Sequence, residues 1–207
     1  MKPVLFFTVF ALLPAGLWAQ WDACAIGGGS QTSIDRRGAN GFAVTAVGNP
    51  LGGPADTIAF VSGSAKLEGD CEIITRVTRL QDATWEWAEG GLMLRETLGT
   101  DSKFVALACT QSHGLHSYAR TQPAAALTNQ EDGAYKLPYW IKLVRQGNHV
   151  LGYKSSDGMI WIQTDDVTVP MRKFLWVGAF ATSGPGPAVT VVFDHIVIHM
   201  AADASAK

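Results

Sequence analysis

Residues 137–161 constrain the fold of this 207-residue chain more than any other segment. Apolar residues alternate with polar ones there, which is the period of a β-strand with one solvated face: Ile141, Leu143, Val150. The sequences Gln-Gly-Asn at 146–148 and Ser-Asp-Gly at 156–158 supply residues that tight turns prefer. The segment therefore predicts two antiparallel strands followed by the start of a third, in which Trp161 is expected to pack in the core.

Similar strand patterns, separated by turn residues, extend along most of the chain. Strands are expected at 41–47, 56–61, 71–80, 92–96, 104–110, 114–120, 174–182 and 189–199. Residues 104–110 are apolar on both faces, which places that strand centrally in its sheet. Residues 121–135 are expected to form a loop with at most one helical turn. Because no helix-length amphipathic run occurs, the pattern predicts an all-β chain in two stacked antiparallel sheets.

The first 19 residues are expected to lie outside this domain. Lys2 precedes an apolar run at 4–17 that is interrupted by Thr8, Pro14 and Gly16, and Leu17-Trp18-Ala19 offers a cleavage site. The run is short for a membrane span, so it predicts a secretory signal peptide, with an uncleaved anchor as the alternative. Residues 20–200 then form a single domain, 201–207 a flexible tail, and the protein is secreted or held in the periplasm or cell envelope.

Charge and cysteine content narrow the possible partners. The 16 basic and 18 acidic residues form no basic stripe, which argues against nucleic acid. There is no basic amphipathic helix, so no membrane insertion is expected after removal of the leader. Cys24, Cys71 and Cys109 allow one disulfide in an oxidising compartment, but buried thiols explain Cys71 and Cys109 equally well.

The order of several short motifs resembles the concanavalin A-like lectin/glucanase superfamily. Within it, the chain is most similar to the uncharacterised bacterial domain family related to the yeast regulator-of-enolase protein, over about residues 21–198. The motifs that carry the resemblance are Ala25-Ile26-Gly27, Asp56–Phe60, Gly69-Asp70, Trp87–Glu96, Arg120, Pro138–Arg145, Ser156-Asp157-Gly158, Val177-Gly178 and Phe193–Ile196. The resemblance implies a jelly-roll sandwich and no particular reaction. This chain has Glu89-Gly90-Gly91 where the family is expected to carry Lys-Ala-Gly, so no polar site is carried over there.

Aromatic and arginine side chains on the predicted strands indicate a carbohydrate site. Sugars are held by flat aromatic rings together with polar groups that reach their hydroxyls. If Leu92 and Leu94 face the core, Arg95 faces outward with Met93. The candidate ligand-binding residues are Trp87, Arg95, Tyr118 and Arg120. The alternative for Arg95 is a structural ion pair with Glu72 or Glu96.

The spacing of acidic residues and histidines does not predict a catalytic or zinc site. Glu86 and Glu89 are three residues apart, which puts them on opposite faces of a strand, so they are expected to be solvated carboxylates and not a glycosidase pair. His113 and His116 alone do not make a zinc site. No cofactor is expected, although Asp56 or Asp194 could contribute to a structural calcium site.

The sequence therefore favours a secreted β-sandwich that binds carbohydrate or a glycan-bearing surface without catalysis. Two alternatives remain open: a structural or protein-interaction module of the cell envelope, which would have a protein partner, and a glycoside hydrolase-like enzyme with an unrecognised site. An open aromatic-lined hollow favours sugar, whereas a flat apolar patch favours protein.

Overall fold

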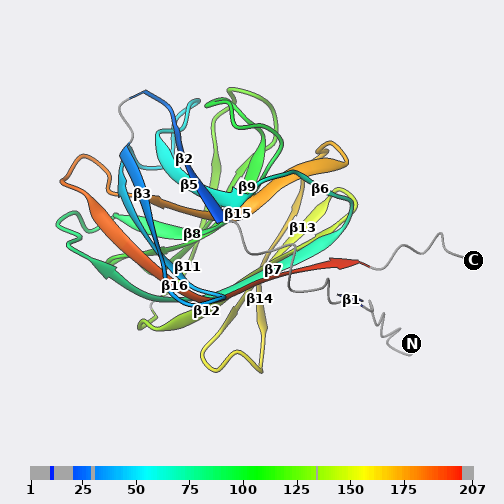
Figure 1. The fold of residues 1–207 in the computed structure, drawn as a ribbon. Helices are drawn as coiled ribbons and strands as arrows, with labels where there is room; N and C mark the ends of the chain where they lie inside the picture. Colours follow the sequence, from blue (N-terminus) through cyan, green and yellow to red (C-terminus); the bar gives the residue numbers. More distant parts are fainter. Residues whose placement is uncertain (1–9, 12–20, 29–30, 134, 202–207) are drawn as a thin grey trace, which may run out of the picture.

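The computed structural model describes residues 10–11, 21–28, 31–133 and 135–201, which form two stacked antiparallel sheets (Figure 1). The predicted leader, apart from 10–11, and the predicted tail from 202 lie outside the described residues, so both stay predictions. The sixteen strands of the described residues are β1 (Phe10–Ala11), β2 (Trp21–Ile26), β3 (Gln31–Arg36), β4 (Phe42–Val47), β5 (Ile58–Gly63), β6 (Leu67–Glu68), β7 (Cys71–Gln81), β8 (Glu89–Arg95), β9 (Phe104–Thr110), β10 (Leu115–Arg120), β11 (Thr128–Asp132), β12 (Tyr139–Gln146), β13 (His149–Ser155), β14 (Ile162–Thr168), β15 (Phe174–Thr182) and β16 (Val189–Ala201).

Each sheet combines strands that are distant in sequence. The first sheet has the order β14-β13-β12-β7-β16-β4-β3, with β1 pairing with β16. The second sheet has the order β11-β10-β9-β8-β15-β5-β2, with β6 pairing with β15. The long strands β7 and β16 pair at the centre of the first sheet, and β8 pairs with β9 and β15 in the second. This arrangement confirms the predicted all-β, two-sheet jelly-roll sandwich.

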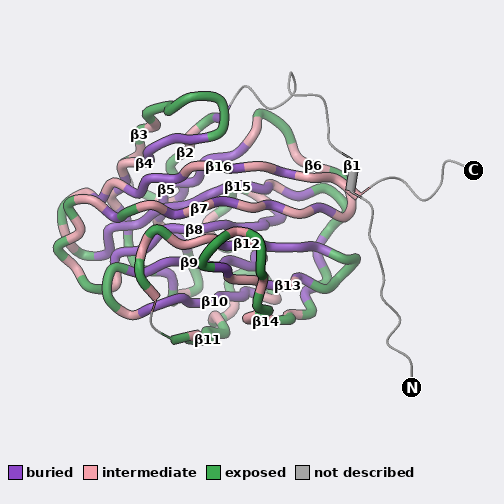
Figure 2. The backbone as a smooth tube through the Cα atoms, turned by 90° about the horizontal axis from the view of Figure 1, so that it is seen from below, coloured by how far each residue is buried: buried purple, intermediate pink, exposed green. Residues whose placement is uncertain are grey.

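The alternation of residues explains how the two sheets pack. In β7 the side chains of Cys71, Ile73, Thr75 and Val77 are buried, while the residues between them are partly exposed. The buried apolar ones face β8 and β9 across the interior, where Leu92, Leu94 and their neighbours complete one continuous core. The burial pattern in Figure 2 follows this arrangement, with buried backbone along the middle strands of both sheets.

The second sheet is buried on its outer face as well. Every residue of β8, β9 and β10 is buried. The side chains that point away from the first sheet form a second apolar cluster: Ile26, Leu51, Ile58, Phe60, Met93, Phe104, Ala106, Ala108, Tyr118 and Phe180. Leu51 belongs to the segment between β4 and β5, so loops cover part of this outer face. The prediction that 104–110 is a central strand is confirmed.

Several sequence expectations differ from the structure. Residues 128–132 of the predicted loop form the edge strand β11, because its backbone pairs with β10 although its side chains are mostly exposed. Trp161 is partly exposed instead of packed in the core, with the Lys142 ammonium 4.4 Å from its ring centroid. The cysteines agree with one of the two alternatives, because all three are unbridged and both Cys71 and Cys109 are buried thiols. Within the described residues, no helix has the length and apolarity needed to cross a membrane.

Candidate functional site

A pocket of about 250 Å³ opens on the outer face of the second sheet, at the end where β8 begins. It is lined by Pro50, Leu51, Trp85, Trp87, Glu89, Tyr118 and Asn129. Three of these seven residues are aromatic and one is a carboxylate. We call it the aromatic pocket.

Glu89 is the charged group of the aromatic pocket, and it is only 1% exposed. One of its carboxylate oxygens accepts a hydrogen bond from the Tyr118 hydroxyl at 2.9 Å, and the other accepts one from the Leu51 backbone N–H at 3.3 Å. Burial raises the pKa of Glu89 to about 7, although both hydrogen bonds act to lower it. The expectation of a solvated carboxylate is therefore wrong: Glu89 is the first residue of β8, and its side chain is enclosed under the 48–57 segment.

The position of Trp87 is set by the turn between β9 and β10. The backbone N–H groups of Gln111 and Ser112 donate to the carbonyls of Ala88 and Glu86, at 2.8 and 3.0 Å. These bonds tie the turn to the segment before β8 and bring the His113 ring parallel to Trp87, with centroids 3.5 Å apart. The His113 imidazole therefore stacks on one face of the Trp87 indole, and the indole also lines the pocket.

Trp85 is positioned by a glycine on another loop. Gly184 has φ of +68°, and a Cβ added there would lie 2.0 Å from Cε3 of the Trp85 ring. Only a residue without a side chain allows this approach. The loop after β15 therefore supports one wall of the aromatic pocket.

Arg95 and Arg120 lie on the same face of the sheet as Tyr118, as the alternation predicted, but both are 0% exposed. Both Asp56 oxygens accept hydrogen bonds from Arg120, at 2.7 and 3.0 Å, and the second also accepts one from Arg95 at 3.3 Å. Burial lowers the pKa of Arg95, and the Asp56 charge opposes this effect. Arg95 therefore pairs with Asp56, and not with Glu72 or Glu96, the partners expected from the sequence. The two guanidinium groups are therefore enclosed by protein, and they fix the 48–57 segment through Asp56.

Of the four candidate ligand-binding residues, the structure brings only Trp87 and Tyr118 to the aromatic pocket. Sequence reasoning missed Glu89 and Asn129. Side chains two residues apart lie on the same face of a strand, so Glu89 lies on the face of Met93 and Arg95. The strand was expected to begin at residue 92, and a start at 89 would have placed Glu89 on this face. Asn129 carried no such signal, because β11 is polar on both faces.

The histidines and aspartates considered above as metal ligands have protein partners. The two ring nitrogens of His116 lie 3.1 Å from Asn129 Oδ1 and the His113 carbonyl oxygen. Asp194 accepts two hydrogen bonds from Arg76, at 2.5 and 2.8 Å, just as Asp56 accepts them from its arginines. No group of three or more potential metal ligands occurs among the described residues.

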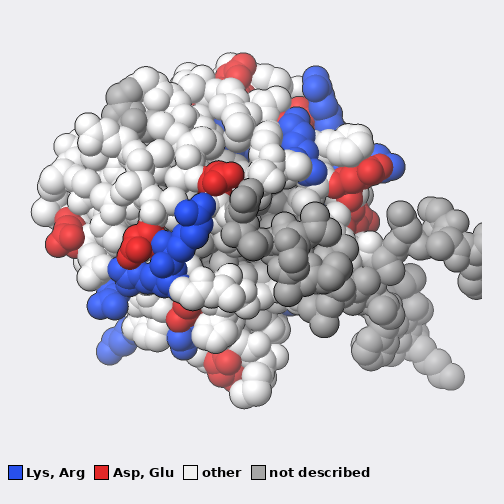
Figure 3. Space-filling model, in the orientation of Figure 1, with Lys and Arg blue, Asp and Glu red and all other residues white. Residues whose placement is uncertain are grey.

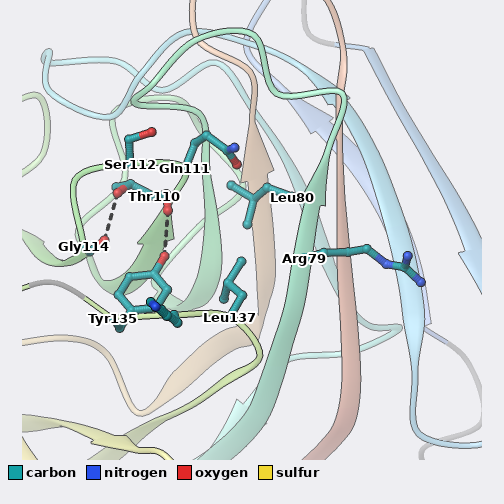
Figure 4. Close-up of a pocket in the computed structure, with 9 residues that line it drawn as sticks. Arg79, Leu80, Thr110, Gln111, Ser112, Gly114, Tyr135 and Leu137 are labelled. Atoms are coloured by element: carbon teal, nitrogen blue, oxygen red, sulfur yellow. Dashed lines mark hydrogen bonds between the residues drawn. The ribbon is translucent and has the colours of Figure 1, made fainter.

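A second pocket, of about 470 Å³, lies between the end of β7, the β9–β10 turn and residues 135–137 (Figure 4). The Tyr135 hydroxyl donates to the Thr110 carbonyl at 2.7 Å, and Figure 4 shows the Arg79 side chain extending away from the cavity. This pocket is larger than the aromatic pocket, but the described residues that line it include no tryptophan and no carboxylate.

The tip that connects β13 to β14 carries neighbouring exposed apolar residues. Met159, Ile160 and Ile162 are 79%, 73% and 58% exposed. Figure 3 shows that basic and acidic side chains lie near one another on the face displayed, with large uncharged areas between them.

Comparison with solved structures identifies the fold. A functionally unknown protein from Saccharomyces cerevisiae matches with a TM-score of 0.66 and 13% identity, covering 89% of this chain and 97% of that one. The carbohydrate-binding module CBM66 from Bacillus subtilis matches with a TM-score of 0.58 and 13% identity, covering 86% and 95%. A β-1,3-1,4-glucanase (lichenase) derived from a mouse hindgut metagenome matches with a TM-score of 0.57 and 9% identity, covering 88% and 93%. No family model matches the chain, and no curated protein matches its sequence. With its two-sheet topology, the chain has the concanavalin A-like, glucanase-like β-sandwich fold.

Proposed function

We propose that this protein is a secreted or envelope-located module that binds carbohydrate in the aromatic pocket without breaking bonds in it. The observation that carries the proposal is the convergence of Trp85, Trp87 and Tyr118 around the carboxylate of Glu89. Aromatic rings pack against the C–H faces of sugars, while carboxylate and amide oxygens accept hydrogen bonds from hydroxyl groups. The similarity to a carbohydrate-binding module supports the same class of ligand.

The roles of the predicted site residues differ within this proposal. Trp87 and Tyr118 contact the ligand, together with Glu89 and Asn129. Arg95 and Arg120 act at a distance, because they hold Asp56 and thereby the segment that contributes Leu51 to the pocket. We also propose a relationship to the uncharacterised bacterial domain family, for which the motif order described above is the support.

The test is binding of the purified protein to a broad glycan array, followed by titration of the best ligand. Trp87→Ala should weaken binding at least tenfold, or about 1.4 kcal/mol. Trp161→Ala is the matched control, because Trp161 lies in the segment before β14 of the first sheet and does not line the pocket. Absence of binding across the array, or an equal loss in both variants, contradicts the proposal.

A glycoside hydrolase is the second candidate, and the raised pKa of Glu89 favours it because a general acid must hold its proton near neutral pH. Hydrolysis in most such enzymes needs a second carboxylate within about 5–10 Å of the first. Among the described residues, Glu89 is the only carboxylate that lines the aromatic pocket, and the side chain of Glu86 is 62% exposed outside it. Release of reducing ends from a bound glycan, abolished by Glu89→Gln, would establish the enzyme and refute the non-catalytic proposal.

A protein-interaction module is the third candidate, favoured by the exposed tip at 159–162. Replacing Met159 and Ile160 by serine should weaken binding of a protein partner at this tip. Glycan binding should not change, because these residues lie outside the aromatic pocket.

A further inference from the structure

The buried carboxylates of this protein are neutralised by cations, with one exception. Asp56, Glu89 and Glu96 are the buried acidic side chains of the described residues. Asp56 pairs with two arginines, and Glu96 pairs with Lys103 at 2.9 Å. Glu89 has no ion-pair partner among the described residues, and its two hydrogen-bond donors are both neutral. A buried carboxylate without a counter-ion is costly, so its retention at a pocket needs a physical reason.

The walls of the aromatic pocket suit a positive charge. Trp85, Trp87 and Tyr118 present the π-systems that attract cations, and no lysine or arginine of the part of the chain that the structure describes lines the pocket. A carboxylate offers about four acceptor positions. Tyr118 and Leu51 use one on each oxygen of Glu89, so acceptor capacity remains for a further donor.

We propose that the aromatic pocket prefers a sugar bearing a protonated amine, a hexosamine unit, over the corresponding neutral sugar, with Glu89 receiving the ammonium group. This inference rests on the proposed carbohydrate binding and adds the chemical class of the ligand. The volume of about 250 Å³ lies just below the usual range for ligand pockets, which favours a single sugar unit in contact with Glu89. An ammonium group gains both the Coulomb attraction and the charge-assisted hydrogen bond, whereas a neutral hydroxyl gains only a hydrogen bond.

Among the described residues, the titratable groups near Glu89 form no ion pair with it, and Tyr135 interacts with it as a second phenol. Tyr118 from β10 donates to it as a neutral phenol, and burial raises the pKa of this phenol. Both ring nitrogens of His116, on the same strand, are used in contacts with Asn129 and the His113 carbonyl. His113, on the far side of Trp87, pairs with Glu86 at 3.2 Å.

Calorimetric titration at pH 7 with three oligosaccharides of equal length tests the inference: oligomers of glucosamine, of N-acetylglucosamine and of glucose. The glucosamine oligomer should bind at least tenfold more tightly than both neutral ones. Glu89→Gln keeps the shape but removes the charge, so the glucosamine oligomer should lose its tenfold advantage over the two neutral oligomers. Asn129→Ala is the matched control, which should weaken all three to a similar extent.

Proton linkage gives a second readout that a purely structural role of Glu89 would not produce. Binding of the glucosamine oligomer at a pH low enough for its amines to be fully protonated in solution should release protons from Glu89, because an ammonium group stabilises the ionised carboxylate. The neutral oligomers should release none. The release is measured by repeating the titration in buffers of different ionisation enthalpy.

The outcomes distinguish this inference from the function on which it rests. Equal affinity for all three oligomers, or a preference that survives in Glu89→Gln, overturns the amine preference and leaves carbohydrate binding intact. Binding of lysine amide as tightly as the glucosamine oligomer overturns the assignment to a sugar and indicates a protein side chain as the cation. Failure of any glycan to bind contradicts the proposed function itself.

Discussion

Replacing Glu89 by glutamine should change the pH dependence of stability in a defined direction. Burial raises the pKa of Glu89 to about 7, from 4.5 in an unfolded chain. The folded protein therefore binds a proton more tightly than the unfolded chain does. Between pH 4.5 and 7 the folded state carries the extra proton, so this residue makes the free energy of unfolding decrease as the pH rises.

The magnitude follows from the difference between the two pKa values. From 4.5 to about 7, the difference corresponds to a loss of about 3 kcal/mol of stability once the pH is above 7. Glutamine resembles the protonated carboxyl in shape and charge. Glu89→Gln should therefore be close to wild type in stability at pH 4.5 and about 3 kcal/mol more stable at pH 8.5.

Urea unfolding of both proteins at several pH values between 4.5 and 8.5 measures this difference. Glu96→Gln is the matched control of opposite sign. Burial acts to raise the pKa of Glu96, but bonds from Lys103 and Arg172 outweigh it, so the pKa of Glu96 is lowered. That variant should lose stability at neutral pH and approach wild type in acid. A difference between Glu89→Gln and wild type that stays constant with pH would refute the argument, because Glu89 would then ionise equally in both states.

Three further predictions concern the surroundings of the aromatic pocket and the core. Gly184→Ala should destabilise the fold by about 1–3 kcal/mol and weaken glycan binding, because the added methyl group meets Trp85; unfolding and glycan titrations measure the two effects. Asp56→Asn should lower the free energy of unfolding by about 3–5 kcal/mol in urea, because it leaves two buried guanidinium groups without a counter-ion. With a thiol reagent at pH 8, partly exposed Cys24 should react first and Cys109 only on unfolding, since burial raises the pKa of the Cys109 thiol to about 12; equal rates in the native protein would contradict this.

Local patterns were enough to predict most strands, because each depends on alternation between neighbouring residues. The predicted strand at 104–110 agrees with β9, and 174–182 agrees with β15. The edge strand β11 was missed because an edge strand with both faces polar has no alternation to detect. Trp161 was misplaced because its position depends on the path of the chain after a turn.

The candidate site was predicted only in part, and for a similar reason. Alternation along β8 correctly put Arg95 on the outer face of its sheet, with Leu92 and Leu94 in the core. Whether that face is open depends on loops that pack over it. The segment at 48–57 covers Arg95 and leaves Trp87 at the edge of a pocket.

The sequence by itself determined the strand periodicity, the turns and hence a two-sheet sandwich, because backbone geometry and side-chain alternation are local properties of the chain. Only the tertiary structure decided which charges are neutralised. Asp56 pairs with Arg95 and Arg120, which are 39 and 64 residues away in the sequence, while the buried Glu89 accepts hydrogen bonds from neutral donors. Burial and charge pairing are set by contacts between distant segments, and the electrostatic character of the aromatic pocket follows from those contacts.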